Sequence, residues 1–210
     1  MTRLEIISDV VCPWCYIGKA NLDRALAEAG NPFAIRWRPF QLNPDMPAEG
    51  MDHRAYYAAK FGEERAAAIR ERWTEAGRAS GLALRFDRIG RAVNSLDAHR
   101  VLRWAEAEGV QHDLAGALFR RYFEAGEDIS DRAVLAEAAA EAGMDRAGTA
   151  RLLEGDADRE AVRADAAAAA AMGVSGVPTF LLGGRYAVSG AQPPAMWVRL
   201  ISEIEVALNA

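Results

Sequence analysis

The chain contains two cysteines, Cys12 and Cys15, with only Pro13 and Trp14 between them. On a helix, residues three positions apart lie on the same face, with Cβ atoms roughly 5–6 Å apart. Two sulfurs held at this spacing can form and break a disulfide with little movement of the backbone. Because the sequence has no other cysteine, no separate structural disulfide is possible. The spacing therefore predicts that the first turn of one helix holds both thiols.

The neighbouring residues predict where this turn lies. An apolar run from Leu4 to Val11, interrupted by Glu5 and Asp9, predicts a strand. A helical pattern begins at Pro13, and proline is favoured at the first helical position, which puts Cys12 at or next to the N-cap. The positive end of the helix dipole and the free backbone N–H groups stabilise a thiolate there. We therefore expect Cys12 to attack substrates and Cys15, a turn further in, to resolve the product.

The remaining sequence has α/β character at its two ends and helical character between them. Residues 1–44 predict a strand, a helix and a second strand, whereas residues 52–172 have an almost wholly helical pattern. Residues 179–208 predict a β-hairpin followed by a closing helix. This order predicts an α/β, thioredoxin-like fold with a large all-helical insertion. The expected boundaries are residues 1–50 and 173–210 for the discontinuous thioredoxin-like domain and 51–172 for the inserted helical domain.

Four segments of the chain resemble a known family. The motif from Asp9 to Gly18, DVVCPWCYIG, is similar to that of the DsbA family of thiol–disulfide oxidoreductases, and specifically to its FrnE-like branch. The segments Pro39–Pro44, Gly176–Phe180 and Ser189–Gln192 also match the family's pattern. The resemblance is specific at both ends of the chain and looser in the middle. It implies a DsbA-like fold in which a helical insertion interrupts the thioredoxin-like domain.

The resemblance also implies roles for individual residues. Pro178 would be the cis-proline that faces the thiols, and the backbone of Val177 would pair with a bound substrate. Pro13 and Trp14 would shape access to the Cys12 sulfur. Asn94 and Ser95 precede a helix and are most simply its N-cap, but related glutathione-dependent enzymes have an asparagine near the thiol site. The expected catalytic residues are Cys12 and Cys15, and the expected substrate-binding residues are Pro13, Trp14, Val177, Pro178 and Asn94.

The implied activity is thiol–disulfide exchange with a disulfide-containing protein or a small-molecule thiol substrate. No resident cofactor is expected, and glutathione stays open as a redox partner or co-substrate. One alternative is a glutathione-dependent isomerase or transferase of the 2-hydroxychromene-2-carboxylate isomerase type, although those relatives generally carry serine where Cys12 stands. Another alternative is a chaperone whose helical lobe binds client proteins, with the disulfide acting as the switch for this binding. The retention of both thiols favours disulfide exchange.

Other interpretations of the polar residues carry less weight. Zinc needs four ligands, or three and a water, and His53, His99 and His112 do not have ligand spacing, so we expect no metal site. Two roles stay open for Asp9: it could relay protons to Cys15, or it could be a solvated acid at the end of a strand. We assign no role to His99.

Charge and hydropathy exclude further classes of function. The net charge is −5, with 25 basic and 30 acidic residues spread along the chain, which argues against a nucleic-acid partner. The longest apolar run, around Ala166–Val174, is far shorter than the roughly 20 residues of a membrane span. The first residues lack the pattern of a secretory leader. We therefore expect a cytoplasmic protein with no membrane partner, and the sequence leaves its oligomeric state open.

Overall fold

A mixed four-stranded sheet is built from the two ends of the chain. The computed structural model describes residues 1–209, and its main sheet has the strand order β2-β1-β5-β6. Strand β1 (Thr2–Ser8) is parallel to β2 (Phe33–Pro39) and antiparallel to β5 (Thr179–Leu182), which pairs with β6 (Tyr186–Ser189). Residues from the first and last parts of the chain are therefore neighbours at the centre of the sheet.

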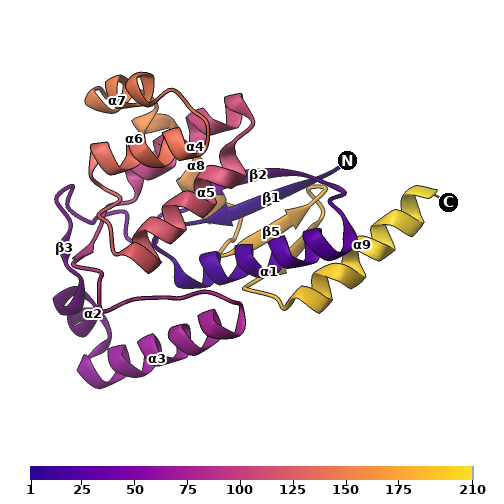
Figure 1. Cartoon of the computed structure of the whole chain (residues 1–210), viewed down its shortest axis with the longest axis horizontal. Coiled ribbons are helices and arrows are strands. Elements are labelled where there is room, and N and C mark those ends of the chain that lie inside the picture. The colour runs from indigo at the N-terminus through magenta and orange to yellow at the C-terminus, as the bar shows by residue number, and fades with distance from the viewer. Residues whose placement is uncertain (210) are drawn as a thin grey trace.

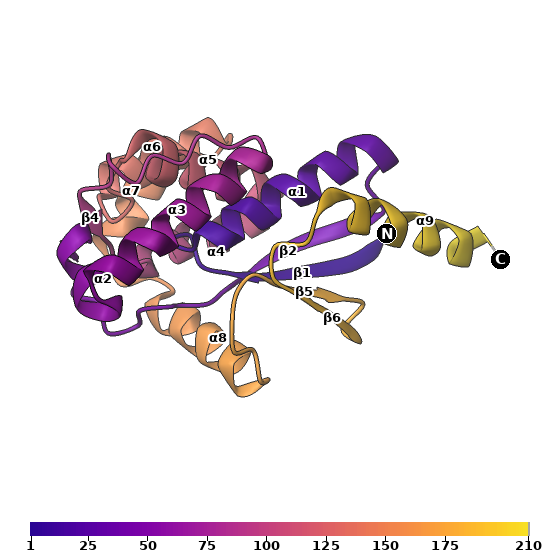
Figure 2. The ribbon, with the colours of Figure 1, turned by 90° about the horizontal axis from the view of Figure 1, so that it is seen from below.

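Helices cover both faces of this sheet. Helix α1 (Pro13–Ala29) connects β1 to β2 and packs beside α9 (Pro194–Asn209) on one face, and α8 (Arg159–Ala171) lies on the opposite face (Figure 2). The rings of Phe180 and Trp197, 4.8 Å apart, join the sheet to α9. This arrangement buries the second half of β1 on both sides, which explains why Ile6 and Ile7 are both apolar although adjacent residues of a strand face opposite sides.

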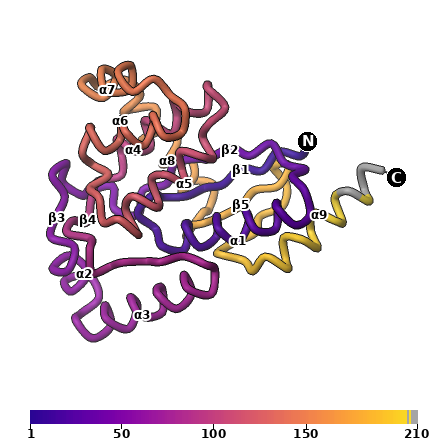
Figure 3. The backbone as a smooth tube through the Cα atoms, in the orientation of Figure 1, coloured from indigo at the N-terminus to yellow at the C-terminus, as the bar shows by residue number. Residues whose placement is uncertain are grey.

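The inserted segment forms a helical lobe at one end of the sheet, and both ends of the chain lie away from that lobe (Figures 1 and 3). Within the lobe, β3 (Met51–Asp52) pairs in antiparallel fashion with β4 (Arg91–Ala92). This pair joins the start of the lobe to the segment before α4 (Leu96–Glu108). The elements of the lobe are β3 (Met51–Asp52), α2 (His53–Phe61), α3 (Glu63–Ala79), β4 (Arg91–Ala92), α4 (Leu96–Glu108), α5 (Gln111–Arg120), the π-turn η1 (Arg121–Ala125), α6 (Arg132–Glu141) and α7 (Arg146–Glu154).

The lobe and the sheet share one apolar core. Helices α4, α5 and α8 all contact β2, and Phe119 of α5 stacks on Tyr16 of α1 with ring centroids 5.2 Å apart. Periodicity predicts a helix over Leu114–Glu124, whereas α5 begins at Gln111 and its last turn widens into η1. That turn packs the Phe123 ring against both Phe119 and Tyr122. Among the described residues, no helix is both long and apolar enough to cross a bilayer.

Candidate active site

The two cysteines lie at the N-terminus of α1, directly after β1. Cys12 is the N-cap, with extended backbone angles (φ −96°, ψ 113°), and Pro13 occupies the first helical position. The amides of Cys15 and Tyr16 donate to the Cys12 carbonyl at 3.0 and 3.3 Å. Proline fits here because its missing N–H would have no partner inside the helix. The local sequence therefore sets the direction in which both thiols point.

The two thiols have similar exposure but different surroundings. Both are free and buried, with 4% of Cys12 and 1% of Cys15 exposed, so their exposures differ little. The Cys12 sulfur donates to the Val177 carbonyl oxygen at 3.6 Å. The loop before β5 thus covers Cys12, which local sequence signals could not reveal. The difference between the two cysteines lies in which groups their sulfurs contact.

Cys15 is the more deeply placed thiol. Burial raises its pKa well above the usual value, and the adjacent Cys12 sulfur raises it further. The Ser8 hydroxyl and the Asp9 backbone oppose this shift, because hydrogen bonds from them stabilise the thiolate. Cys15 therefore holds its proton at neutral pH until a reaction step removes it.

The Val177–Pro178 loop forms one wall beside the thiols. The Val177–Pro178 peptide bond is cis, Pro178 is buried, and its carbonyl accepts a hydrogen bond from the Gly190 amide at 2.8 Å. Gly18, one turn beyond Cys15, allows α1 to approach this loop closely. A Cβ atom at Gly18 would stand 3.1 Å from Pro178 Cγ and 3.4 Å from the Phe180 ring.

Replacing Gly18 with valine should push the Pro178 loop away from α1. We expect the free energy of unfolding to fall by about 1–3 kcal/mol, because extra methyl groups in a packed site force neighbours apart. Urea unfolding measures this loss. Gly90→Ala is the control, because a Cβ there meets nothing within 4 Å and Gly90 does not have a positive φ. Equal stability of the Gly18→Val variant and the wild type would contradict the close packing.

Asp9 forms a buried polar cluster beside the thiols. Its carboxylate is fully buried, accepts a hydrogen bond from the Leu42 amide at 2.8 Å and lies 3.3 Å from His99 Nε2. The same His99 nitrogen is 3.1 Å from the Phe40 carbonyl oxygen. The interpretation of Asp9 as a solvated acid is therefore wrong. One feature of the sequence indicates that Asp9 is buried: it interrupts an apolar run, and an acid buried in such a run needs a polar partner.

The helical lobe covers the CxxC motif through α2 and α3. The Arg72 guanidinium of α3 lies 5.5 Å from the centre of the half-buried Trp14 ring. Burial raises the pKa of Tyr57 in α2, and the charge of Cys12 raises it further. Neither Arg72 nor Tyr57 belongs to a sequence motif, so sequence patterns could not assign either residue to the site. Trp14, in contrast, lies beside the thiols as expected.

His53, which packs behind Tyr57, should make the lobe sensitive to acid. The two rings are 4.7 Å apart, and burial, together with the charge of Arg70, lowers the pKa of His53 from 6.5 to about 4. Between these values the unfolded chain binds a proton that the folded chain does not, so stability falls as the pH drops through this window. The loss should be at most about 3 kcal/mol. Urea unfolding of wild type and His53→Phe across pH 4–7 tests this, and equal slopes would contradict it.

Asn94 connects two loops at the start of α4. Its Nδ2 donates to the Met46 carbonyl at 2.6 Å, and its Oδ1 accepts from the Leu96 amide at 2.9 Å. The N-cap of α4 is Ser95, whose side chain makes no capping hydrogen bond, so Asn94 is not the N-cap but bonds the first turn from one residue earlier and also holds the segment after β2. Its expected contact with substrate stays a prediction. Among the side chains that the structure describes, no three His, Cys, Asp or Glu residues gather in a way that could hold a metal ion.

Comparison with known proteins places this site in a family. The model of the DSBA-like thioredoxin domain matches residues 3–202. A probable DsbA oxidoreductase from Streptomyces coelicolor is 34% identical, with a TM-score of 0.86 over 97% of this chain and 89% of that one. The cytosolic disulfide reductase DsbM from Pseudomonas aeruginosa, also solved with glutathione (GSH), is 25% identical, with a TM-score of 0.70 over 98% and 99% of the two chains.

A 2-hydroxychromene-2-carboxylate isomerase has the same fold, at 17% identity, with a TM-score of 0.71 over 99% of both chains. These likenesses agree with the observed sheet order and with the helical segment inserted between β2 and β5. The match of the domain covers almost the whole chain, including both cysteines and the Val177–Pro178 loop. The chain therefore belongs to the family of DsbA-like thioredoxin-domain proteins.

Proposed function

We propose that the chain is a thiol–disulfide oxidoreductase that uses Cys12 as nucleophile and Cys15 as resolving thiol. The observation that carries this proposal is the position of Cys12. It is the N-cap of α1, and its sulfur donates a hydrogen bond to the Val177 carbonyl at 3.6 Å, beside the Pro178 loop. The motif Asp9–Gly18 further supports assignment to the FrnE-like branch.

The reaction that we propose has two exchange steps. The Cys12 thiolate attacks one sulfur of the substrate disulfide, so the S–S bond breaks and one substrate thiolate leaves. Cys15 then loses its proton and attacks the Cys12 sulfur of the mixed disulfide. The second substrate sulfur leaves as a thiolate and takes up a proton. The substrate has gained two electrons, and the enzyme now has a Cys12–Cys15 disulfide.

We propose glutathione as the thiol that reduces this disulfide again, and the cytoplasm as the compartment. The support is the likeness to DsbM, which is a cytosolic disulfide reductase and has been solved with glutathione. The cytoplasmic thiol pool favours net reduction of substrates by such a pair. Pro13, Trp14, Val177 and Pro178 would contact the substrate around the Cys12 sulfur.

Steady-state reduction of a peptide disulfide, with glutathione as the only reductant, tests this function. We expect turnover that saturates with peptide and needs both cysteines. In the reduced protein a small alkylating agent should modify Cys12 before Cys15, because burial raises the pKa of Cys15. An isomerase of the 2-hydroxychromene-2-carboxylate type would instead bind glutathione tightly and leave the peptide oxidised. Preferential alkylation of Cys15 would reverse the assigned roles.

A further inference from the structure

A positive charge from the helical lobe lies over the CxxC motif. The Arg72 guanidinium carbon is 5.5 Å from the centre of the half-buried Trp14 ring, within the roughly 6 Å over which a cation is attracted to an aromatic face. Trp14 is the second residue of α1 and stands between the two cysteines in the sequence. Arg72 belongs to α3, which packs beside the start of α1 (Figures 1 and 2). The lobe thus places a cation next to the redox pair.

The backbone that carries Arg72 is held in place by the residue that follows it. Trp73 is buried, and its ring packs against the rings of Tyr57 and Phe86, with centroids 5.8 and 5.5 Å away. Phe86 in turn packs against Phe123, at 6.0 Å, in the core that the lobe shares with the sheet. Because this aromatic chain anchors α3 at the position of Arg72, the guanidinium needs little further ordering to meet a ligand.

The hydrogen-bonding groups of Arg72 are available to a ligand. The residue is exposed, and within the described part of the chain its guanidinium forms neither a hydrogen bond nor an ion pair. A guanidinium has five N–H donors in one plane, and two of them can bind the two oxygens of a carboxylate at once. Arg72 can therefore bind a carboxylate without first releasing an acid of the protein.

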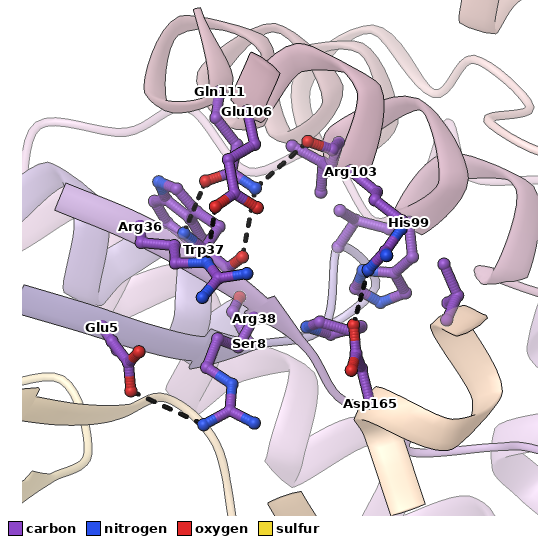
Figure 4. A pocket seen from close by; sticks show the side chains of 14 residues that line it. Glu5, Ser8, Arg36, Trp37, Arg38, His99, Arg103, Glu106, Gln111 and Asp165 are labelled. Carbon is purple, nitrogen blue, oxygen red and sulfur yellow. Dashed lines mark hydrogen bonds and ion pairs between the residues drawn. The ribbon is translucent and has the colours of Figure 1, made fainter. Parts of the chain in front are cut away.

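Arginines elsewhere at the junction of the lobe and the sheet are already neutralised. Three of them surround a polar cavity of about 210 Å³, and each has a carboxylate partner (Figure 4). The pairs are Arg36–Glu106 at 2.7 Å, Arg38–Glu5 at 3.5 Å and Arg103–Asp165 at 2.8 Å. The acids nearest to Arg72 in the sequence, Glu71 and Glu75, line a separate groove that α3 forms with residues 84–89. The charge of Arg72 thus stays uncompensated beside the CxxC motif.

We propose that Arg72 makes the chain select disulfides that have a carboxylate beside the reacting cysteine, as in an acidic peptide segment. The proposal rests on the proposed function, because it concerns the substrate that Cys12 attacks. A peptide bonded to Cys12 lies close to the Trp14 ring, since both residues belong to the first turn of α1. An acidic residue beside the peptide's cysteine then pairs with the guanidinium through charge-assisted hydrogen bonds. A basic residue at the same place is repelled.

Three peptides with an internal disulfide test this selection. They share one sequence and differ only in the residue beside each cysteine, which is glutamate, glutamine or lysine. The fully reduced protein is mixed with each peptide without glutathione, because the carboxylates of glutathione would themselves respond to Arg72. Quenched samples give the rate constant of peptide reduction. The glutamate peptide should react about fivefold faster than the glutamine peptide, as for a charged pair that stays partly exposed, and the lysine peptide should react slowest.

Variants of α3 assign the preference to one residue. The readout is the ratio of the glutamate and lysine rates, because a change in the reactivity of Cys12 affects every peptide equally. Arg72→Glu should reverse this ratio, and Arg72→Lys should keep part of it, since lysine keeps the charge but not the planar donors. Arg78→Glu is the matched control: it makes the same charge change on the same helix, at an exposed residue that lines the separate groove. It should keep the wild-type ratio.

The outcomes separate this proposal from the proposed function. Equal rates for the three peptides in the wild type overturn the selection by Arg72, and so does a wild-type ratio in Arg72→Glu. A ratio that Arg78→Glu changes as much as Arg72→Glu would assign the preference to the charge of the whole protein. Slowing of all peptides alike in Arg72→Glu would leave Arg72 only a packing role against Trp14, which also overturns the proposal. If the wild type reduces none of the peptides, the proposed function itself fails. Thermal unfolding confirms that each variant is folded.

Discussion

Replacing Cys15 with serine should make the chain accumulate mixed disulfides with its substrates. Cys12 keeps its position at the N-cap of α1 and still attacks, but no second thiol remains to release the product. Turnover of a peptide disulfide should fall by about 10³-fold or more, a scale that fits the loss of a reacting group. Mass spectrometry of the protein after exposure to an excess of oxidised peptide would detect one peptide bound per chain, through Cys12.

The matched control is Cys12→Ser, which should neither turn over nor trap the peptide. Cys15 alone is a poor nucleophile in this chain, because burial raises its pKa and only 1% of the residue is exposed. Trapping by Cys12→Ser instead of Cys15→Ser would exchange the assigned roles. The absence of an adduct in Cys15→Ser, with Cys12 still open to alkylation, would favour the isomerase or transferase function.

Replacing Asp9 with alanine should produce the largest loss of stability among substitutions at the site. The change leaves the Leu42 amide without its acceptor and leaves the buried His99 nitrogen with the Phe40 carbonyl alone. Removing one member of such a buried polar cluster costs about 2–4 kcal/mol. Turnover should fall as well, because the segment after β2 is no longer held against the turn that carries Cys12. Urea unfolding and peptide turnover measure the two effects.

Asp156→Ala is the control for this prediction. Asp156 also pairs with a basic group, Arg159, at 2.9 Å, but 92% of its side chain is exposed. An exposed pair of this kind contributes less than about 1 kcal/mol. If the two alanine variants lost equal stability, the Asp9 cluster would have no special role.

Local physical chemistry made the redox motif and most elements predictable. The proline after Cys12 marks the start of α1, and the apolar run before it matches β1. Strands β5 and β6 form the hairpin that the sequence predicts from residue 179 onward, because turn residues and short β-rich runs are signals within a few residues. The pair β3–β4 has only two residues in each strand, which is too short for the alternation of apolar and polar residues that predicts a strand.

The sequence by itself determined where the two thiols lie, which of them caps the helix, and that a helical segment interrupts the α/β fold. Only the tertiary structure decided what surrounds the thiols. Asp9 meets His99 across 90 residues, and Cys12 meets the Val177 carbonyl across 165, so no local pattern encodes either contact. The polar cavity of about 210 Å³, lined by Ser8 and His99 among others, likewise forms only where α4, α5 and α8 pack on β2. Helix and strand signals act within a few residues, whereas burial, which sets the pKa of Cys15, depends on every segment that packs around it.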